Sequence, residues 1–402
     1  MNGPWFHPAA PGTPGQEPAL SGASTQSVTV VGAGLAGLRT VERLRYRGYQ
    51  GRVVLLGAEP HPPYDRPPLS KQVLRGERDS PWLRSAEDYA GLDVEVRLGE
   101  RVHALDVEQR ALSTAADARL PYDVLVIATG ASPRRLPGID GRVLRTLDDS
   151  AGLRGELGPD ARLAIIGAGL IGCEVAASAR SLGVEVDLID VLPGPLIRVV
   201  GPQVCDLVAD LHRAHGVRLH MGTGATRGGP GQLALGDGTV LAADVVLEAI
   251  GAVPETGWLE GSQLGLADGV VCDADGRAAD GVYAVGDVAR WDGRRSEHWT
   301  NAGWQADRVA AGILGQDPPL PEPAYWWSDQ YDIKLQGIGA PAPDDEVHLA
   351  TVGAKARTVA LYARDGRLTG VVGFSAGAGV MRLRGDVVAG SDVAEVLARL
   401  AP

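Results

Sequence analysis

Short apolar runs alternate with amphipathic stretches along most of the chain. The first run, Val28 to Val31, predicts a buried strand, and the run Val53 to Leu56 predicts another. Between them, four apolar residues that face one side predict a helix: Leu35, Leu38, Val41 and Leu44. The order strand, helix, strand is typical of a parallel sheet covered by helices.

The same pattern begins again near the middle of the chain, so the sequence contains an internal repeat. A strand from Leu163 to Ile166, a helix to about Leu182 and a strand from Val184 to Ile189 repeat the first unit. The last buried strand of each half also ends in a similar motif, Ala128-Thr129-Gly130 in the first half and Ala249-Ile250-Gly251 in the second. Two similar α/β units are therefore predicted.

Further elements extend these two units. The pattern predicts a helix from Pro202 to about Ala214, a hairpin from Leu233 to Leu241 and a helix from about Asn301 to Leu314. The pair Asp237-Gly238 in the hairpin predicts a type I′ turn, which needs a positive φ at both central residues.

The composition changes after residues 316–323, a segment with four prolines that predicts a linker. Beyond it, Asp365-Gly366 predicts a hairpin turn, and Ser391 is the expected N-cap of a last helix. Four runs predict antiparallel strands: 334–337, 346–352, 358–363 and 367–373.

The predicted fold class is α/β, with two Rossmann-like dinucleotide-binding domains and a small C-terminal α+β domain. We expect a flexible tail over residues 1–26. The first Rossmann-like domain is expected to comprise 27–145 and 266–320, the second 146–265, and the C-terminal domain 321–402.

A glycine fingerprint follows the first strand of each unit, Gly32-x-Gly34-x-x-Gly37 and Gly167-x-Gly169-x-x-Gly172. The first glycine permits a tight turn, the second lets the backbone approach a pyrophosphate, and the third lets helix and strand pack closely. A carboxylate then follows or ends the second strand, Glu59 in one unit and Asp190 in the other, where it can accept hydrogen bonds from a ribose. A flavin in one unit and a nicotinamide cofactor in the other explain two such sites.

The charge and the cysteines exclude several other classes. A formal net charge of -12 argues against binding to nucleic acid or to anionic membranes. The three cysteines, Cys173, Cys205 and Cys272, are far apart, which argues against a disulfide framework or a metal site. With no secretory signal and no bilayer-length apolar run, we expect a cytoplasmic protein.

The segment Pro63-Tyr-Asp-Arg-Pro-Pro-Leu-Ser-Lys71 resembles the signature of the NADH-dependent, FAD-containing ferredoxin reductases that serve oxygenases and cytochromes P450. The resemblance covers residues 27 to about 335 and implies a glutathione-reductase-like arrangement of the two Rossmann-like domains. It weakens afterwards, because this chain has Gly373 to Gly379 where the family usually carries an Asn-x-Pro stretch. Other short motifs also match: Ala128-Thr-Gly130, Leu144-Arg-Thr146, Ile171-Gly-Cys-Glu174, Val285-Gly-Asp287, Glu297-His-Trp299 and Trp327-Ser-Asp-Gln330.

This resemblance implies that the first unit holds FAD. Glu59 is expected at the adenosine ribose, Val102 at the adenine, Arg145 at the phosphate or ribityl region, and Asp287 at the ribityl chain. The full set of residues expected around FAD is Gly32, Gly34, Ala36, Gly37, Glu59, Arg66, Lys71, Val102, Ala128, Thr129, Gly130, Arg145, Gly286, Asp287 and Trp299.

The second unit is expected to hold the nicotinamide cofactor. A carboxylate at Asp190, followed by Val191 rather than an arginine, favours NADH over NADPH, because it accepts the 2′-hydroxyl and repels a 2′-phosphate. The residues expected around NADH are Gly167, Gly169, Leu170, Ile171, Gly172, Glu174, Asp190 and Gly251.

Three residues are catalytic candidates by the same resemblance. Lys71 is expected near the flavin ring, where a cation would stabilise the negative charge that arrives with a hydride. Glu174 is expected beside the nicotinamide and paired with Lys71, and Trp299 is expected to line the isoalloxazine. No metal ligand is predicted.

The implied reaction is hydride transfer from NADH to FAD, followed by transfer of single electrons to a small acidic iron–sulfur ferredoxin that feeds an oxygenase or a cytochrome P450. We expect the enzyme to be a monomer or a weak dimer. An acidic partner requires a local basic patch, for which there are five candidates: Arg84, Arg290, Arg294, Arg295 and Lys334.

Three other functions use the same scaffold. A disulfide or peroxide reductase needs a redox cysteine after the first unit's acid, but Arg66 to Lys71 contains Ser70 and no cysteine. An NADH-binding signalling flavoprotein resembling apoptosis-inducing factor, distinguished by slow flavin reduction, stays open. So does a biosynthetic flavoenzyme that acts directly on a small molecule.

Overall fold

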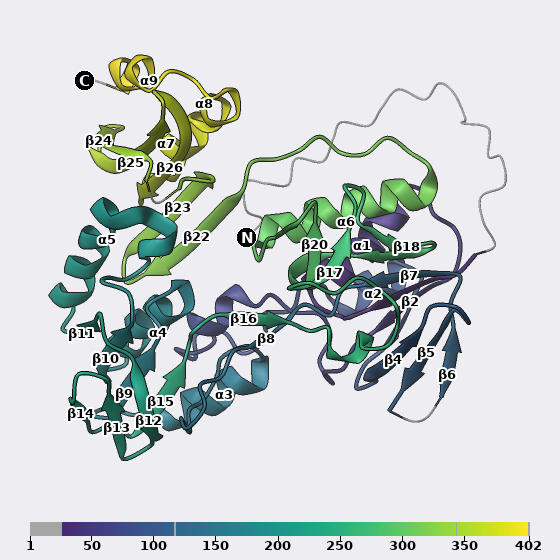
Figure 1. Cartoon of the computed structure of the whole chain (residues 1–402), viewed down its shortest axis with the longest axis horizontal. Helices are drawn as coiled ribbons and strands as arrows, with labels where there is room; N and C mark the ends of the chain where they lie inside the picture. Colours follow the sequence, from purple (N-terminus) through teal and green to yellow (C-terminus); the bar gives the residue numbers. More distant parts are fainter. Residues whose placement is uncertain (1–25, 116–117, 343, 401–402) are drawn as a thin grey trace.

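A computed structural model of the chain describes residues 26–115, 118–342 and 344–400. The predicted flexible tail therefore lies outside the described residues, except for its last residue. Two parallel sheets and one antiparallel sheet organise the described chain, in agreement with the predicted fold class (Figure 1).

The first parallel sheet is built around β1 (Val28–Val31), which pairs in parallel with β2 (Val53–Leu56) and β7 (Val124–Ile127). These three strands are buried at every position, as is typical of parallel strands covered on both faces. β3 (Val94–Arg97), β19 (Val282–Ala284) and β18 (Arg277–Ala279) complete the strand order β18-β19-β7-β1-β2-β3.

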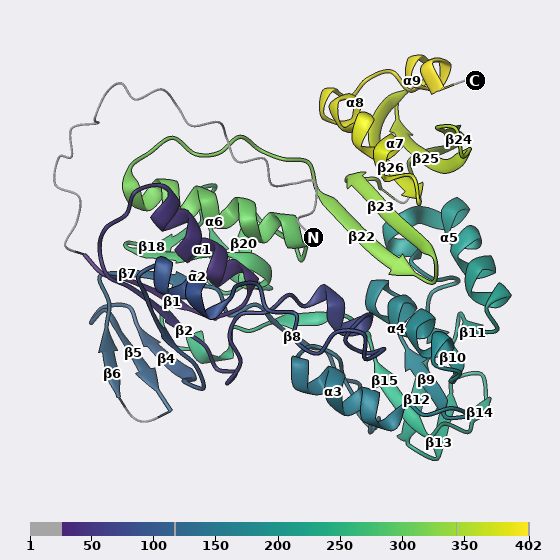
Figure 2. The same cartoon turned by 180° about the vertical axis from the view of Figure 1, so that it is seen from behind.

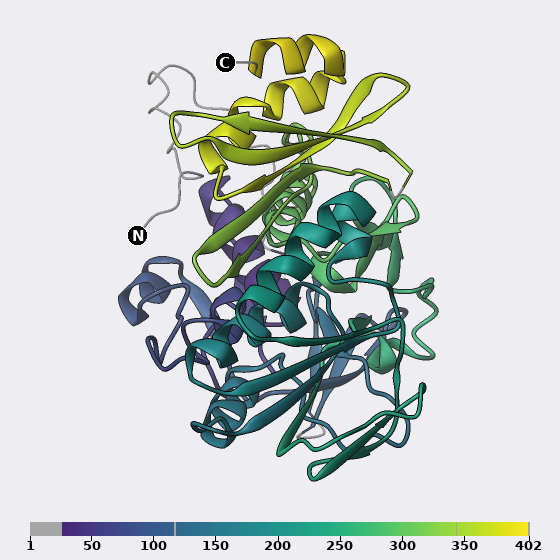
Figure 3. The same ribbon diagram turned by 90° about the vertical axis from the view of Figure 1, so that its left-hand side faces the viewer.

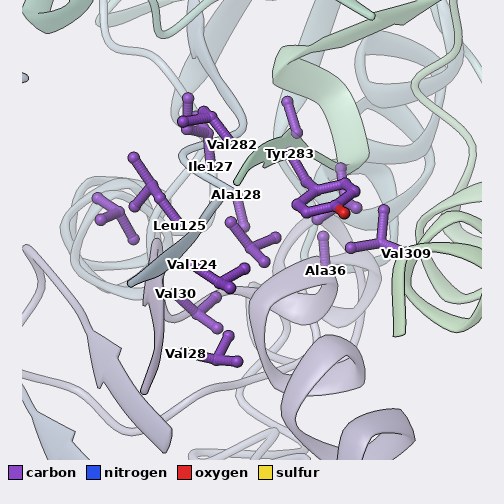
Figure 4. Close-up of a cluster of buried hydrophobic side chains, with 14 of the residues drawn as sticks. Val28, Val30, Ala36, Val124, Leu125, Ile127, Ala128, Val282, Tyr283 and Val309 are labelled. Atoms are coloured by element: carbon purple, nitrogen blue, oxygen red, sulfur yellow. The ribbon is translucent and has the colours of Figure 1, made fainter. Parts of the chain in front are cut away.

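Two helices that are far apart in the sequence pack side by side on this sheet. They are α1 (Leu35–Tyr46) and α6 (Trp299–Leu314), which lie next to each other in both face views (Figures 1 and 2). The close-up in Figure 4 shows Ala36 of α1 and Val309 of α6 beside Tyr283 of β19, and all three residues belong to one hydrophobic core. Packing of α6 therefore returns the chain to the first unit after it has built the second.

The second parallel sheet has the strand order β11-β10-β9-β15. Its strands are β9 (Arg162–Ile166), β10 (Glu185–Asp190), β11 (Arg218–Met221) and β15 (Val245–Glu248). The helices of this region are α3 (Leu147–Glu156), α4 (Leu170–Ser181) and α5 (Ile197–Ala214). The internal repeat seen in the sequence is therefore a repeat of a strand–glycine turn–helix–strand unit.

A short ribbon connects the two units. β8 (Ala131–Pro133) follows Gly130, β16 (Ala252–Pro254) follows Gly251, and the two strands pair antiparallel. Both glycines have a positive φ, +73° and +94°, which lets the chain turn sharply at the end of each buried strand.

Smaller elements surround these sheets. An antiparallel excursion contains β4 (Val102–Asp106), β5 (Ala111–Thr114) and β6 (Arg119–Pro121), and a second contains β12 (Ala225–Gly229), β13 (Gln232–Leu235) and β14 (Val240–Leu241). The others are α2 (Ala86–Gly91), β17 (Val270–Cys272), β20 (Ala289–Trp291), β21 (Arg294–Arg295) and three 3₁₀ turns, η1 (Pro67–Ser70), η2 (Gly257–Leu259) and η3 (Gly286–Val288).

The C-terminal sheet has the order β22-β23-β26-β25-β24. Its strands are β22 (Tyr325–Gln330), β23 (Ile333–Gly339), β24 (Glu346–Val352), β25 (Arg357–Arg364) and β26 (Arg367–Phe374). α7 (Gly377–Arg382), α8 (Arg384–Ala389) and α9 (Val393–Leu400) lie on the side of this sheet away from α5 (Figure 3).

The helix predicted from Pro202 to about Ala214 is confirmed as the second part of α5, because Gly201, whose φ of +71° is not helical, interrupts α5 directly before Pro202. Other local predictions differ from the structure. The Asp237-Gly238 turn is not type I′, because only Gly238 has a positive φ. β22 was not predicted. The last helix is capped by Asp392, whose carboxylate accepts from two helix amides, and not by Ser391.

By contrast, the Asp365-Gly366 turn has a positive φ at both residues, as a type I′ hairpin requires. The helix predicted from about Asn301 to Leu314 is also present as α6, which begins two residues earlier, at Trp299. None of the helices in the described part of the chain is long and apolar enough to cross a bilayer.

Candidate active site

One cavity of about 1040 Å³ opens between the two parallel sheets. Residues of the first glycine turn line it together with the first residues of α4, which belongs to the second unit. In open α/β sheets, ligands bind outside the carboxyl ends of the strands, and both fingerprints stand at such ends. The cavity therefore extends from the first glycine turn to Gly169 and the start of α4, at the edge of the second dinucleotide site.

The first fingerprint has the shape of a pyrophosphate cradle. Gly32 has φ +116°, and a Cβ there would overlap the carbonyl of Ala128, while a Cβ on Gly37 would overlap the carbonyl of Gly32. Gly34 is different, because a Cβ built there meets no protein atom within 4 Å. The free space in front of Gly34 belongs to the cavity and fits a ligand that comes close to the backbone.

Glu59 stands on the cavity wall after β2, in a network of short hydrogen bonds. Its carboxylate accepts from the hydroxyl of Tyr64 at 2.6 Å and pairs with Arg66 at 2.9 Å. Arg66 also donates to the carbonyl of Arg145. Burial, together with the bond to Glu59, raises the pKa of Tyr64 above its ordinary value, so the phenol stays a hydrogen-bond donor.

A second ion pair, between Arg145 and Asp287, also lines the cavity. The guanidinium of Arg145 pairs with Asp287 of η3 at 2.8 Å, and its Nε is buried without a partner among the described residues. A buried donor without an acceptor is costly, so this atom is suited to a polar ligand group. Val102 of β4 also lines the cavity and is buried.

Lys71 and Glu174 form a buried ion pair between the two units. Their nitrogen and oxygen are 2.7 Å apart, and their side chains are only 4% and 7% exposed. Ser70 donates to the same carboxylate oxygen, and Ser178 of α4 donates to the carbonyl of Ser70 at 2.7 Å. The pairing of Lys71 with Glu174 that the resemblance implied is therefore confirmed as a contact.

An aromatic group closes the cavity next to this pair. The indole of Trp299 donates to Asp65 at 2.8 Å and meets Trp327 edge to face at 5.9 Å between ring centroids. The guanidinium of Arg39 lies 5.7 Å from the Trp299 ring, within range of a cation–π contact. Burial raises the pKa of Asp65 despite this hydrogen bond and the nearby cations.

The second fingerprint repeats the geometry of the first. Gly167 has φ +107°, a Cβ on Gly172 would overlap the carbonyl of Gly167, and a Cβ on Gly169 meets no atom within 4 Å. Asp190, at the end of β10, accepts from the backbone amides of Ala168 at 2.7 Å and Leu192 at 2.8 Å. Both carboxylate oxygens are thus fixed beside the glycine turn.

Most residues expected at the cofactors line the one cavity. Four of them do not: Gly37 and Gly172, which pack helix against turn, and Gly167 and Asp190. The nineteen that do are Gly32, Gly34, Ala36, Glu59, Arg66, Lys71, Val102, Ala128, Thr129, Gly130, Arg145, Gly169, Leu170, Ile171, Glu174, Gly251, Gly286, Asp287 and Trp299.

Sequence reasoning assigned no role to several polar residues of the wall. Asp65 and Ser70 belong to the Pro63–Lys71 segment, but only the structure shows that they bond Trp299 and Glu174. His298 also lines the cavity. The local signal for all three was their place inside a motif whose neighbouring residues had been assigned.

The cysteines take no part in the site. Cys173, Cys205 and Cys272 are all buried, and none of them lines the cavity. Burial raises the pKa of each thiol, which disfavours the reactive thiolate. The site therefore lacks the thiol that disulfide chemistry requires.

The chain belongs to the pyridine nucleotide-disulphide oxidoreductase family, whose model matches residues 26–306. A second model, the reductase C-terminal domain, matches residues 325–398. The match over 325–398 covers the region where the sequence motifs weakened, so the unusual 373–379 segment does not remove the chain from the family. The chain binds FAD and NAD(H), as this family and its NAD(+) reductases do.

Among its relatives are ferredoxin reductases of oxygenase systems. The chain is 39% identical over 367 residues to the ferredoxin reductase component of chlorobenzene dioxygenase from Cupriavidus sp., covering 87% of this chain and 89% of that protein. It is 40% identical over 332 residues to the ferredoxin–NAD(+) reductase component of the biphenyl dioxygenase system of Paraburkholderia xenovorans, covering 78% and 81%.

A solved structure of the same kind superposes closely. The covalent complex of putidaredoxin reductase with putidaredoxin matches with a TM-score of 0.85 at 31% identity, over 91% of this chain and 93% of that chain. The predicted fold class is thus confirmed both by the element order and by structures of ferredoxin reductases.

The basic residues expected at a partner surface are largely compensated. Arg84, Arg295 and Lys334 lie within 4 Å of carboxylates of Glu42, Glu297 and Asp329, respectively. Arg290 donates to two backbone carbonyls, and Arg294 is exposed on β21. Only the β20–β21 hairpin therefore presents several of the predicted cations together.

Proposed function

We propose that this chain is the NADH-dependent ferredoxin reductase of an oxygenase or cytochrome P450 system. It passes a hydride from NADH to bound FAD, and then single electrons to a small acidic iron–sulfur ferredoxin. The observation that carries the proposal is the single cavity, lined by both glycine turns, with the Lys71–Glu174 pair between them. The similarity to reductases of dioxygenase systems supports it.

The proposal assigns FAD to the domain formed by residues 27–145 and 266–320, and NADH to residues 146–265. The first glycine turn, with Glu59 and Arg66, would hold the adenosine diphosphate part of FAD. Arg145 and Asp287 would hold the chain that leads to the flavin. The second glycine turn and Asp190 would hold NADH, and residues 321–402 would complete the wall with Trp327.

When bound, FAD supplies a group that accepts two electrons together and releases them one at a time. The chain supplies position and charge. Lys71 is held by Glu174 as a fixed cation in a water-poor wall, where a charge acts more strongly than in water. Asp65 holds the Trp299 ring in one orientation through its indole N–H. No side-chain nucleophile is needed for such a reaction.

The partner and the setting form part of the same proposal. Putidaredoxin, in the complex with putidaredoxin reductase, is a precedent for a small partner protein. We place this enzyme in the cytoplasm as a monomer or weak dimer, and we place the partner's acidic surface against Arg290 and Arg294. Rim charges of this kind act mainly on the association rate and its salt dependence.

The decisive test is anaerobic mixing of the FAD-loaded protein with NADH. We expect rapid bleaching of the flavin, and reduction of cytochrome c once a suitable ferredoxin is added. Absence of bleaching would rule out the hydride step. Slow bleaching that leaves a long-lived charge-transfer band, with no relay through any ferredoxin, would instead favour the signalling flavoprotein.

Replacement of Asp190 by alanine should weaken the preference for NADH. Alanine has no carboxylate, so the hydrogen bonds with the two backbone amides and with the 2′-hydroxyl are lost. The repulsion of a 2′-phosphate is lost with them. We expect the ratio of kcat/KM for NADH to that for NADPH to fall by about tenfold, equivalent to about 1.4 kcal/mol. An unchanged ratio would refute the role of Asp190 in cofactor choice.

A further inference from the structure

The proposed reaction leaves one proton inside the protein in every cycle. NADH gives up a hydride, which is two electrons and one proton, whereas each ferredoxin takes one electron and no proton. The balance is NADH plus two oxidised ferredoxins giving NAD⁺, two reduced ferredoxins and H⁺. A proton set free in a cavity needs a group that carries it to water.

One histidine lines this cavity and also a second, smaller one. The second cavity, of about 150 Å³, lies between the start of α6 and the proline-rich segment before β22. Its walls include Asn301, Glu322 and Ala324, and His298 is the one residue among those described that lines both cavities. Pro321 and Glu322 are exposed, so the smaller cavity reaches the protein surface.

The imidazole of His298 has no structural task that would occupy it. His298 is the N-cap of α6, a position that favours Ser, Thr, Asp or Asn because their oxygens accept from the first helix amides. The side chain of His298 makes no such capping bond. Within the described residues no hydrogen-bond partner of the imidazole is found, so both ring nitrogens are available.

Two carboxylates of residues that line the main cavity act on His298. They belong to Glu297, next to it in sequence, and to Asp287 of η3. Each is balanced by an arginine: Glu297 pairs with Arg295, and Asp287 pairs with Arg145.

The smaller cavity adds one more carboxylate, that of Glu322, which lies 3.7 Å from Arg384. Burial lowers the pKa of His298, although the charges of Glu297 and Asp287 oppose this effect. Burial therefore favours the neutral imidazole, which is the form that can accept a proton.

We propose that His298 carries the released proton from the main cavity to the smaller cavity and so to solvent. One ring nitrogen accepts the proton on the cofactor side, and the other nitrogen gives its proton to water on the surface side. This inference rests on the proposed function, because a proton is left behind only when the acceptor takes electrons without protons, as a ferredoxin does. His298 is thus a proton carrier for the second half of the reaction and is not needed for the arrival of the hydride.

The test is His298→Gln, which keeps a polar side chain of similar length without a titratable group. Anaerobic bleaching of the flavin by NADH should stay within twofold of wild type. Oxidation of the reduced enzyme by a ferredoxin should slow by about tenfold or more, with proton release to an indicator dye slowed equally. Added imidazole should restore both rates. The matched control is His348→Gln on the edge strand β24, which lines neither cavity and should leave both rates unchanged.

A second variant leaves the histidine in place and blocks its way to water. Ala324→Leu fills the smaller cavity, and it should slow exchange of the His298 imidazole proton with water, measured by NMR on the protein without NADH. The same spectra should show a His298 pKa below the ordinary value of a histidine. Unchanged exchange in Ala324→Leu, or unchanged dye and oxidation rates in His298→Gln, would overturn the proton path. If wild-type flavin is not bleached by NADH at all, it is the proposed function that fails.

Discussion

Valine in place of Gly34 should remove FAD from the protein, whereas valine in place of Gly169 should leave FAD bound and abolish NADH binding. Both glycines have ordinary extended backbone angles, with φ of −91° and −78°, so valine causes no backbone strain at either position. A Cβ at either position meets no protein atom within 4 Å, so the fold should be kept. The added side chain occupies the space through which a pyrophosphate approaches the backbone.

The measurement is FAD content per chain, from absorbance of the purified protein, together with NADH titration of the flavoprotein. We expect each affected cofactor to bind at least about 100-fold more weakly, since a pyrophosphate held by backbone amides is charge-assisted. Gly152→Val on the exposed surface of α3, where a Cβ also meets nothing, is the control and should retain both cofactors. Loss of NADH binding from Gly34→Val alone would reverse the assignment of the two units.

Those two cradles were predictable because their causes are local. A turn that places Gly32 at φ +116° against the carbonyl of Ala128 can be formed by glycine alone, and the sequence shows the glycine directly. The same holds for Gly167. Buried four-residue strands such as β1 and β2 were found at their bounds for a related reason: burial on both faces demands an unbroken apolar run.

Short sequence motifs gave wrong predictions where the same residues are compatible with two local structures. Asp-Gly serves a type I′ turn at Asp365, but at Asp237 it serves a turn in which glycine alone has a positive φ. Ser391 and Asp392 are both good caps, and in the structure it is the carboxylate of Asp392 that accepts from the first amides of α9. β22 packs against α4 and α6, but it combines aromatic, acidic and amide residues. Its sequence therefore lacks the regular apolar pattern that would predict a buried strand.

The site required contacts between residues far apart in the chain. The Lys71–Glu174 pair forms because η1 packs against α4 across 103 residues of sequence, and periodicity contains no information about that packing. The family resemblance supplied the pairing. It did not supply Asp65 as the partner of Trp299, nor His298 as a wall of two cavities, because these follow from the arrangement of side chains in this chain.

Replacement of Lys71 by methionine should both destabilise the protein and slow the chemistry, and a second substitution should separate the two effects. In Lys71→Met the carboxylate of Glu174 stays buried, and the hydroxyl of Ser70 is its one remaining partner among the described residues. Removing one member of a buried pair costs about 3–5 kcal/mol. We therefore expect a clear fall in the urea midpoint of unfolding, and an NADH-driven reduction of FAD at least about 100-fold slower.

In Lys71→Met/Glu174→Leu the uncompensated carboxylate is gone, and Ser70 keeps its bond to the carbonyl of Pro67 at 3.3 Å. An apolar pair of similar volume is often as stable as a buried ion pair, so the urea midpoint should recover most of its loss. The rate of reduction should not recover, because the cation is still absent. Arg162→Met, which breaks a surface pair with Asp244 of which both members are more than 40% exposed, should change stability by no more than about 1 kcal/mol.

The two readouts separate a catalytic Lys71 from a structural one. If the double variant regains both stability and rate, Lys71 acts only by keeping Glu174 compensated. If it regains stability alone, the cation itself acts on the charge that arrives with the hydride. The buried geometry favours the second outcome, since a fixed ammonium group in a water-poor wall needs no reorganisation when the charge appears.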